Sequence, residues 1–198
     1  SYTFPLGDKT TVIVGEATDV SALYSTACTY SAFTDLLSNC GSGTAAGLGG
    51  GTDSAEAGSA TAAAVYDFGN GFTVAGGLSG AGGSSAGLFT TESHDVYGIQ
   101  AAYNTDSYGV SLSYALTDTS ATAETSFVGI NAFYSFESEG LPSISVGYEK
   151  EDPSGATADA QGYFVGLTWP EVGAGSLSVG MSSTANFADS DTETYQYE

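Results

Sequence analysis

The chain has 198 residues and a formal net charge of −21, because only two basic side chains accompany 23 acidic ones. This charge excludes nucleic acid as a partner and disfavours anionic lipid headgroups, since both require Lys and Arg to neutralise phosphate. A hydrophobic content of 41% with 13 Tyr and 10 Phe is too high for a disordered acidic tail. A single folded domain over residues 1–198 is therefore expected.

Short segments with apolar residues at every second position follow one another and predict about eleven β-strands. Tight turns are predicted where Gly, Asn and Asp allow positive φ, as at Gly69-Asn70-Gly71. Long acidic loops alternate with these short turns, and the longest covers residues 16–60. The predicted strands are residues 1–6, 10–15, 61–68, 72–79, 95–104, 107–117, 126–136, 143–148, 162–169, 176–183 and 194–198.

The clearest alternation lies in residues 108–116, with large apolar side chains at even positions and small residues at odd ones. Successive strand residues point to opposite faces, so this strand has one apolar and one mildly polar face. Several strand centres lack charge over a length close to the roughly 9–11 residues with which a tilted strand crosses a membrane. Aromatic residues recur at strand ends, where rings meet lipid headgroups. The pattern predicts an all-β fold, a segment of an antiparallel transmembrane β-barrel in an outer membrane.

In such a barrel the apolar face contacts membrane lipid and the small polar face lines the lumen. The residues predicted to face the lumen are Gln100, Ser111, Ser113, Asn131, Ser135, Ser145 and Thr168. Loop acids are predicted to form an acidic mouth that concentrates cations, comprising Glu149, Glu151, Asp152, Asp189 and Asp191. The chain has no Arg for the basic ring that is typical of anion-selective pores.

Cys28 and Cys40 both lie in the longest predicted loop. A pair in this position predicts a disulfide made in an oxidising compartment such as a periplasm or cell surface. Two free thiols are the alternative, since no metal-binding spacing accompanies them.

The first predicted strand enters a short turn and the eleventh leaves a long loop, so both run in the same direction. Two parallel strands cannot close an antiparallel barrel, and bacterial barrels carry an even number of strands. Either the chain is a piece of a larger barrel, or the predicted number of strands is wrong by one.

No residue set predicts an enzyme or a cofactor. His94 is the single histidine, and adjacency to Ser93 and Asp95 does not supply the geometry of a catalytic triad. The acids of residues 149–152 and 189–193 are oxygen ligands of the kind that Ca²⁺ prefers. No calcium-loop pattern accompanies them, so solvated acids are the main interpretation and a calcium site is the alternative.

Several segments resemble cyanobacterial outer-membrane porins of the type with an S-layer homology domain and an OprB-like barrel. These segments are Phe4-Pro5-Leu6-Gly7-Asp8, Thr11-Val12-Ile13-Val14-Gly15, Phe33-Thr34-Asp35-Leu36-Leu37, Pro142-Ser143-Ile144-Ser145-Val146-Gly147-Tyr148, Gly162-Tyr163-Phe164-Val165-Gly166-Leu167-Thr168-Trp169 and Leu177-Ser178-Val179-Gly180-Met181. The resemblance implies a passive, trimer-forming channel of the iron-uptake or carbohydrate type.

The expected function is passive diffusion of small hydrophilic solutes or cations through an outer membrane. The alternative is a soluble secreted or cell-surface β-sandwich, such as an adhesive module with calcium-binding acidic loops. A sandwich core uses the same alternation, but its outward face carries acids and lysines. Here the second face is mainly Gly, Ser, Ala and Thr, which favours a lumen lining.

Overall fold

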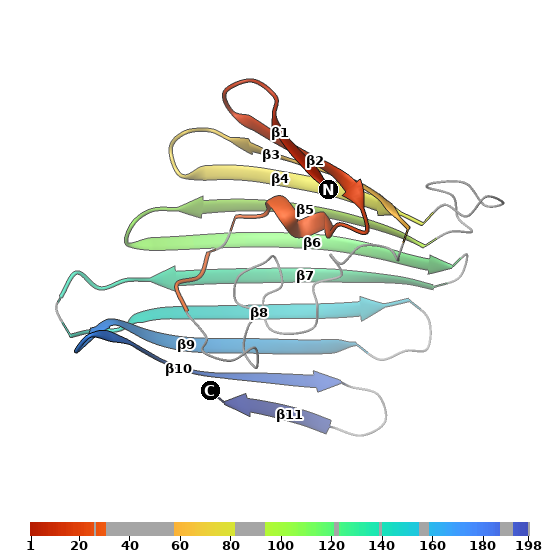
Figure 1. The fold of residues 1–198 in the computed structure, drawn as a ribbon. Helices are drawn as coiled ribbons and strands as arrows, with labels where there is room; N and C mark the ends of the chain where they lie inside the picture. Colours follow the sequence, from red (N-terminus) through yellow and green to blue (C-terminus); the bar gives the residue numbers. More distant parts are fainter. Residues whose placement is uncertain are drawn as a thin grey trace.

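A computed structural model describes residues 1–25, 27–30, 58–81, 94–120, 123–138, 140–154, 159–186 and 192–197. These residues form one antiparallel sheet whose eleven strands follow chain order, so the predicted all-β antiparallel fold is confirmed (Figure 1). The strands are β1 (Tyr2–Pro5), β2 (Thr10–Glu16), β3 (Ala60–Asp67), β4 (Phe72–Gly80), β5 (Asp95–Asn104), β6 (Tyr108–Ser120), β7 (Ala123–Tyr134), β8 (Ser143–Pro153), β9 (Ala160–Val172), β10 (Gly175–Asn186) and β11 (Thr192–Tyr197).

The register of the sheet keeps alternate residues on matching faces across every strand pair. Leu112 lies opposite both Ala101 of β5 and Ile130 of β7, whereas Ser111 lies opposite Ala102 and Asn131. A shift of one residue would move every large apolar side chain to the other face. The apolar pattern of each strand therefore fixes its pairing with the next. We call the face that carries Leu112 the outer face and the face that carries Ser111 the inner face.

The predicted short turns lie together at one end of the sheet, which we call the short-turn end. Gly69 and Gly71 both adopt positive φ between β3 and β4, as the Gly-Asn-Gly sequence predicted. Between β5 and β6 the Thr105 hydroxyl accepts the backbone N–H of Tyr108 at 3.0 Å and closes the turn. Local turn chemistry thus sets the hairpin positions.

Three predicted connections are shorter than expected. β6 and β7 pair as far as Asp118 opposite Glu124, so the loop predicted between residues 117 and 126 is mostly strand. β8 continues to Pro153 where a loop was predicted from residue 149, and β9 continues to Val172. Main-chain hydrogen bonds hold these extensions, and they form regardless of side-chain charge. The strict alternation of short turns and long loops is therefore wrong at the β6–β7 connection.

The sheet is not closed, since β1 and β11 form its two opposite edges (Figure 1). With eleven antiparallel strands, β1 and β11 run in the same direction, so they cannot pair antiparallel with each other. Closure of an antiparallel wall through these edges requires an odd number of additional strands. The described residues include one short 3₁₀ helix, η1 (Val20–Leu23). None of their helices has the length and apolar character needed to cross a membrane.

Candidate channel-lining face

The inner face is built mainly from small and polar side chains that the strand register aligns. Gln100 of β5 lies opposite Ser113 of β6, and Ser111 lies opposite Asn131 of β7. Ser145 and Thr168 extend the same face onto β8 and β9, while Ser135 follows the last residue of β7. Six of the seven residues predicted to face the lumen thus lie on one face of the sheet, and Ser135 lies just beyond its strand. That this face lines an aqueous lumen stays a prediction.

A segment of the longest predicted loop crosses this inner face, and we call residues 17–25 and 27–30 the inner strap. The chain leaves β2 at Ala17, which is held at φ 46°, a left-handed conformation that is uncommon for a residue with a Cβ. It then forms η1 in front of the sheet and continues across the strands that follow (Figure 1). The change of direction at Ala17 brings the strap onto the sheet instead of away from it.

Two backbone N–H groups of the inner strap donate hydrogen bonds to inner-face side chains. The N–H of Ser25 donates to Gln100 Oε1 at 2.7 Å, and the Ser25 and Thr73 hydroxyls lie 2.8 Å apart. The N–H of Thr29 donates to Ser145 Oγ at 3.0 Å. Gln100 and Ser145 are 2% and 1% exposed, so these contacts are shielded from water. An irregular segment has no ladder partners, and such side chains satisfy its buried backbone.

Apolar side chains of the inner strap also pack against the sheet, on either side of these hydrogen bonds along the chain. Val20 is fully buried against Val96, and the Tyr30 ring packs edge-on against Phe164 with centroids 5.1 Å apart. Glycines leave room for these rings. A Cβ on Gly166 would lie 2.6 Å from Phe164 Cζ and 2.8 Å from Tyr30 Cγ, closer than real Cβ atoms come. A side chain at this position is incompatible with the strap as it lies.

Burial raises the pKa of the Tyr24 phenol, because the ionised oxygen would lose its hydration. Its hydroxyl is buried and has no hydrogen-bond partner among the described residues. The same hydroxyl lies over Gly98, where an added Cβ would also come within 2.9 Å of Val20 Cγ1. The inner strap therefore contacts the sheet through the uncharged phenol of Tyr24.

The outer face carries large apolar side chains that no other part of the described chain covers. Leu112 is 55% exposed although it lies at the middle of a central strand, whereas its neighbour Ser113 is 9% exposed. The exposed large apolar residues of β5 to β10 on this face are Tyr97, Ile99, Tyr108, Val110, Leu112, Tyr114, Val128, Ile130, Tyr134, Val146, Tyr148, Tyr163, Val165, Leu177 and Val179. Soluble monomers rarely expose an apolar patch of more than a few hundred Å².

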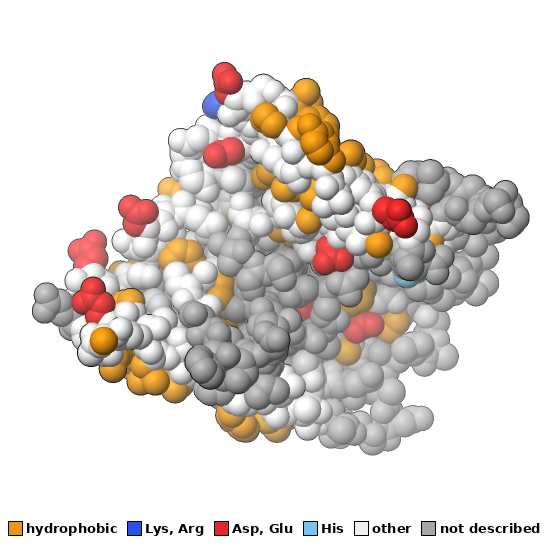
Figure 2. Space-filling model, viewed as in Figure 1, with side chains coloured by type: hydrophobic (Ala, Val, Ile, Leu, Met, Phe, Trp, Pro, Cys, Tyr) orange, Lys and Arg blue, Asp and Glu red, His pale blue; other side chains and the backbone are white. Residues whose placement is uncertain are grey.

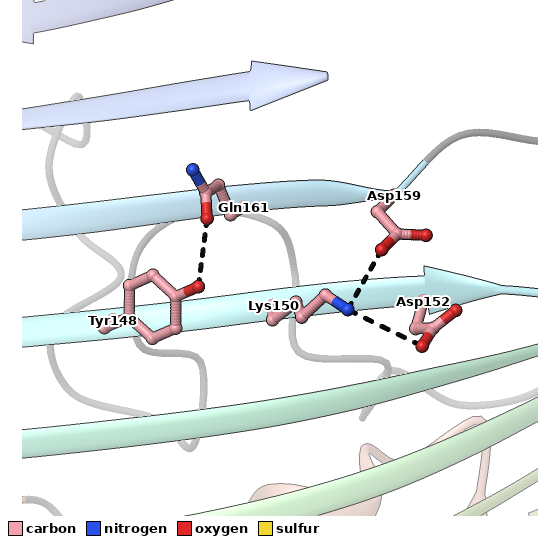
Figure 3. Close-up of polar contacts among 5 residues, drawn as sticks. All are labelled: Tyr148, Lys150, Asp152, Asp159 and Gln161. Carbon is pink, nitrogen blue, oxygen red and sulfur yellow. Dashed lines mark hydrogen bonds and ion pairs between the residues drawn. The ribbon is translucent and has the colours of Figure 1, made fainter. Parts of the chain in front are cut away.

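Polar groups border this apolar surface where β8 and β9 approach their long connection (Figure 3). The Tyr148 hydroxyl donates to Gln161 Oε1 at 3.0 Å. Beyond it, Lys150 Nζ lies 2.9 Å from a carboxylate oxygen of Asp159 and 3.6 Å from one of Asp152. Along β8 the outer face thus changes from the aliphatic Val146 to Tyr148 and then to the ion pair of Lys150.

The predicted loop position is wrong for three acids of the predicted mouth, whereas the mouth itself stays a prediction. Glu149, Glu151 and Asp152 lie in strand β8 and not in a loop. Alternation directs Glu149 and Glu151 to the inner face and Asp152 to the outer face, so the three carboxylates cannot converge on one cation. Glu149 is 1% exposed and lies opposite Gly129 and Gly162, whose lack of side chains leaves it room. Asp189 and Asp191 lie outside the described residues.

The predicted disulfide joins a described residue to one outside the described part of the chain. Cys28 belongs to the inner strap and packs against Phe164, whereas Cys40 lies outside the described residues. The pairing therefore stays a prediction. Among the described residues, no group of three or more His, Cys, Asp or Glu side chains is placed to hold a metal ion.

The inner strap is the feature that the sequence did not reveal. Residues 16–60 were predicted as one loop, with no indication that the first part returns to the sheet. A faint pattern was present, since Val20, Tyr24 and Tyr30 are large apolar residues of a kind that a solvated loop seldom needs. Their partners lie on strands far along the chain, so no local pattern could identify them.

Comparison with known proteins does not assign the chain to a family. No protein-family model matches the sequence, and no curated protein matches it.

Proposed function

We propose that the sheet is part of the wall of an outer-membrane channel for passive diffusion of small hydrophilic solutes and cations. The observation that carries the proposal is the contrast between the faces of the same strands. The outer face exposes large apolar residues along six consecutive strands, while the inner face is mainly small and polar, with a few large residues such as Phe164, and is covered in part by the inner strap. A lipid layer outside and a hydrated path inside would match both faces.

The dimensions of the apolar surface agree with this assignment. On β6 the outer face is apolar from Tyr108 to Leu116, eight steps of about 3.3 Å, or roughly 26 Å along the strand. A tilt of about 40° reduces this length to roughly 20 Å, and the rings at the ends extend it toward the apolar band of about 25 Å typical of such barrels. Tyr108 stands at the short-turn margin of the surface, and Tyr148 stands next to the ion pair of Lys150 on β8, where amphipathic rings are favoured.

In this proposal the inner strap narrows the path, because it crosses the inner face between β4 and β9. Glu151, which is less buried than Glu149, would add negative charge to the same face, and the chain has no Arg to oppose it. Both features favour small cations over anions. The resemblance to cyanobacterial porins agrees with the proposal and adds the expectation of a trimer. A closed antiparallel wall would also need strands in addition to the eleven described.

Nitroxide labels at Val110 and Ser111 test the placement of the two faces. Both residues are adjacent on β6 and differ only in the face to which they point. In reconstituted protein, we expect oxygen, which concentrates in lipid, to relax the label at Val110 more strongly than a water-soluble nickel complex does. The label at Ser111 should give the reverse order or be shielded from both reagents.

Equal exposure of both labels to the nickel complex would refute the proposal. So would protein that is monodisperse without detergent, the result expected of the soluble cell-surface module. Replacement of Glu151 by Gln should reduce the cation preference measured as a reversal potential across planar bilayers. An unchanged reversal potential would show that the inner-face carboxylate of Glu151 does not contribute to cation preference.

A further inference from the structure

A cleft of about 490 Å³ lies at the short-turn end, between the β7–β8 turn and the end of β9. Two aromatic rings and two carboxylates take part in its walls. The residues that line it are Phe136, Glu137, Ser138, Gly140, Leu141, Trp169, Pro170 and Glu171. It uses none of the inner-face residues on which the proposed channel depends.

The two aromatic residues of this cleft continue the apolar outer face. Trp169 pairs across the sheet with Leu177, which is exposed on that face. Phe136 packs against Tyr134, another exposed outer-face ring, with centroids 4.9 Å apart. Glu137 and Glu171 each lie one or two residues further toward the short-turn end, and acidic side chains are visible along this edge in Figure 2. The cleft thus has an apolar, aromatic side and an anionic side.

No basic side chain of the chain is placed to neutralise these carboxylates. The chain has only two lysines and no Arg. Lys150 is bound to Asp159, near the opposite ends of β8 and β9, and the Lys9 amine donates to the carbonyl of Phe68 at 3.1 Å. A cation that occupies the cleft must therefore come from another molecule.

We propose that this cleft binds the ammonium headgroup of a phospholipid, with phosphatidylethanolamine as the expected ligand. An ammonium group is stabilised over the face of Trp and by nearby carboxylates, and here both occur in one cleft. The acyl chains of such a lipid would continue along the apolar outer face next to Trp169. A free amine has no acyl chains to contact that apolar surface, so the observations favour the lipid. The site rests on the proposed membrane placement of the sheet.

Trp169 is the single tryptophan of the chain, so its fluorescence reports on this cleft alone. The protein is reconstituted in mixtures of phosphatidylethanolamine and phosphatidylglycerol, with brominated acyl chains on one lipid and then on the other. We expect brominated phosphatidylethanolamine to quench Trp169 as if it were enriched at least about threefold, the preference that one exposed cation–π contact supplies. Glu137→Gln with Glu171→Gln should bring the preference close to one.

A matched variant, Asp8→Asn with Asp106→Asn, removes the same charge from exposed residues of two other short turns. It should keep the full preference, which separates the cleft from general repulsion of anionic lipid. Equal quenching by both lipids would overturn the site and leave the membrane placement intact, whereas quenching by neither lipid would overturn both. An unchanged preference in the Gln variant would also overturn the site. Soluble ethanolamine that shifts Trp169 emission without any lipid preference would overturn the assignment to a lipid.

Discussion

The outer and inner faces of this sheet are made by alternate residues of the same strands, yet they meet their surroundings in different ways. Leu112 on the outer face is 55% exposed, and Ser113 next to it is 9% exposed. In a soluble protein the apolar residue, Leu112, would be expected to be buried and Ser113 to be exposed. Here the polar residues are covered, in part by a strap whose backbone N–H groups they bind. The comparison supports the proposal that the apolar face contacts lipid.

The strap also explains how the inner face is buried without becoming apolar. Burial of polar groups costs free energy unless each group finds a hydrogen-bond partner. Gln100 and Ser145 accept hydrogen bonds from the backbone N–H groups of Ser25 and Thr29. Each group therefore satisfies the other, and these hydrogen bonds act together with the packing of Tyr30 on Phe164 to hold the segment in place.

The largest effect is expected from a charge on the outer face. Leu112→Asp should destabilise the protein in lipid vesicles by about 2 kcal/mol, because a carboxylate near the membrane midplane must be dehydrated. Ser178→Asp, at a partly exposed position on the inner face of β10, should cost much less. Urea titration of vesicle-reconstituted protein, followed by Trp169 fluorescence, measures both. Equal losses for the two variants would contradict the difference between the faces.

A smaller effect is expected where the strap meets the sheet. Gly166→Ala should destabilise the protein by about 1 kcal/mol, because the Tyr30 and Phe164 rings must move to admit the new methyl group. If the strap narrows a channel, the single-channel conductance should rise as well. Gly175→Ala is the matched control, since an added Cβ there meets nothing within 4 Å. A thermal midpoint of Gly166→Ala equal to that of the control would show that the strap does not rest on β9.

The smallest effect is expected from pH, through Tyr24. Its pKa is raised when the strap is docked and returns to about 10 when the strap is released. The docked state is therefore fully favoured below pH 10 and becomes less stable as the pH rises further. Tyr24→Phe keeps the ring and removes the ionisation, so its strap should stay docked under more alkaline conditions. Conductance recorded from pH 8 to 11.5 in both proteins tests this. Identical profiles would contradict it, because the other tyrosines are common to both.

Much of the sheet could be predicted because its pattern is local. Alternating residues gave the number of strands, and turn sequences such as Gly69-Asn70-Gly71 gave the hairpin positions. Predictions failed where acidic residues were taken as loop. Glu149 and Glu151 lie in β8, because the main-chain ladder continues through them and neighbouring glycines make room. Sequence patterns predict a loop from polar side chains, but a strand ends where the neighbouring strand no longer offers backbone hydrogen-bond partners.

The sequence by itself determined the antiparallel meander and the two unlike faces of its strands. Both follow from a period of two residues and from turns that need only their own residues. Only the tertiary structure decided the path of the inner strap, the burial of Glu149 and the cleft beside Trp169. Each of these joins residues that are distant along the chain, and such contacts are fixed by packing and by backbone groups in need of partners.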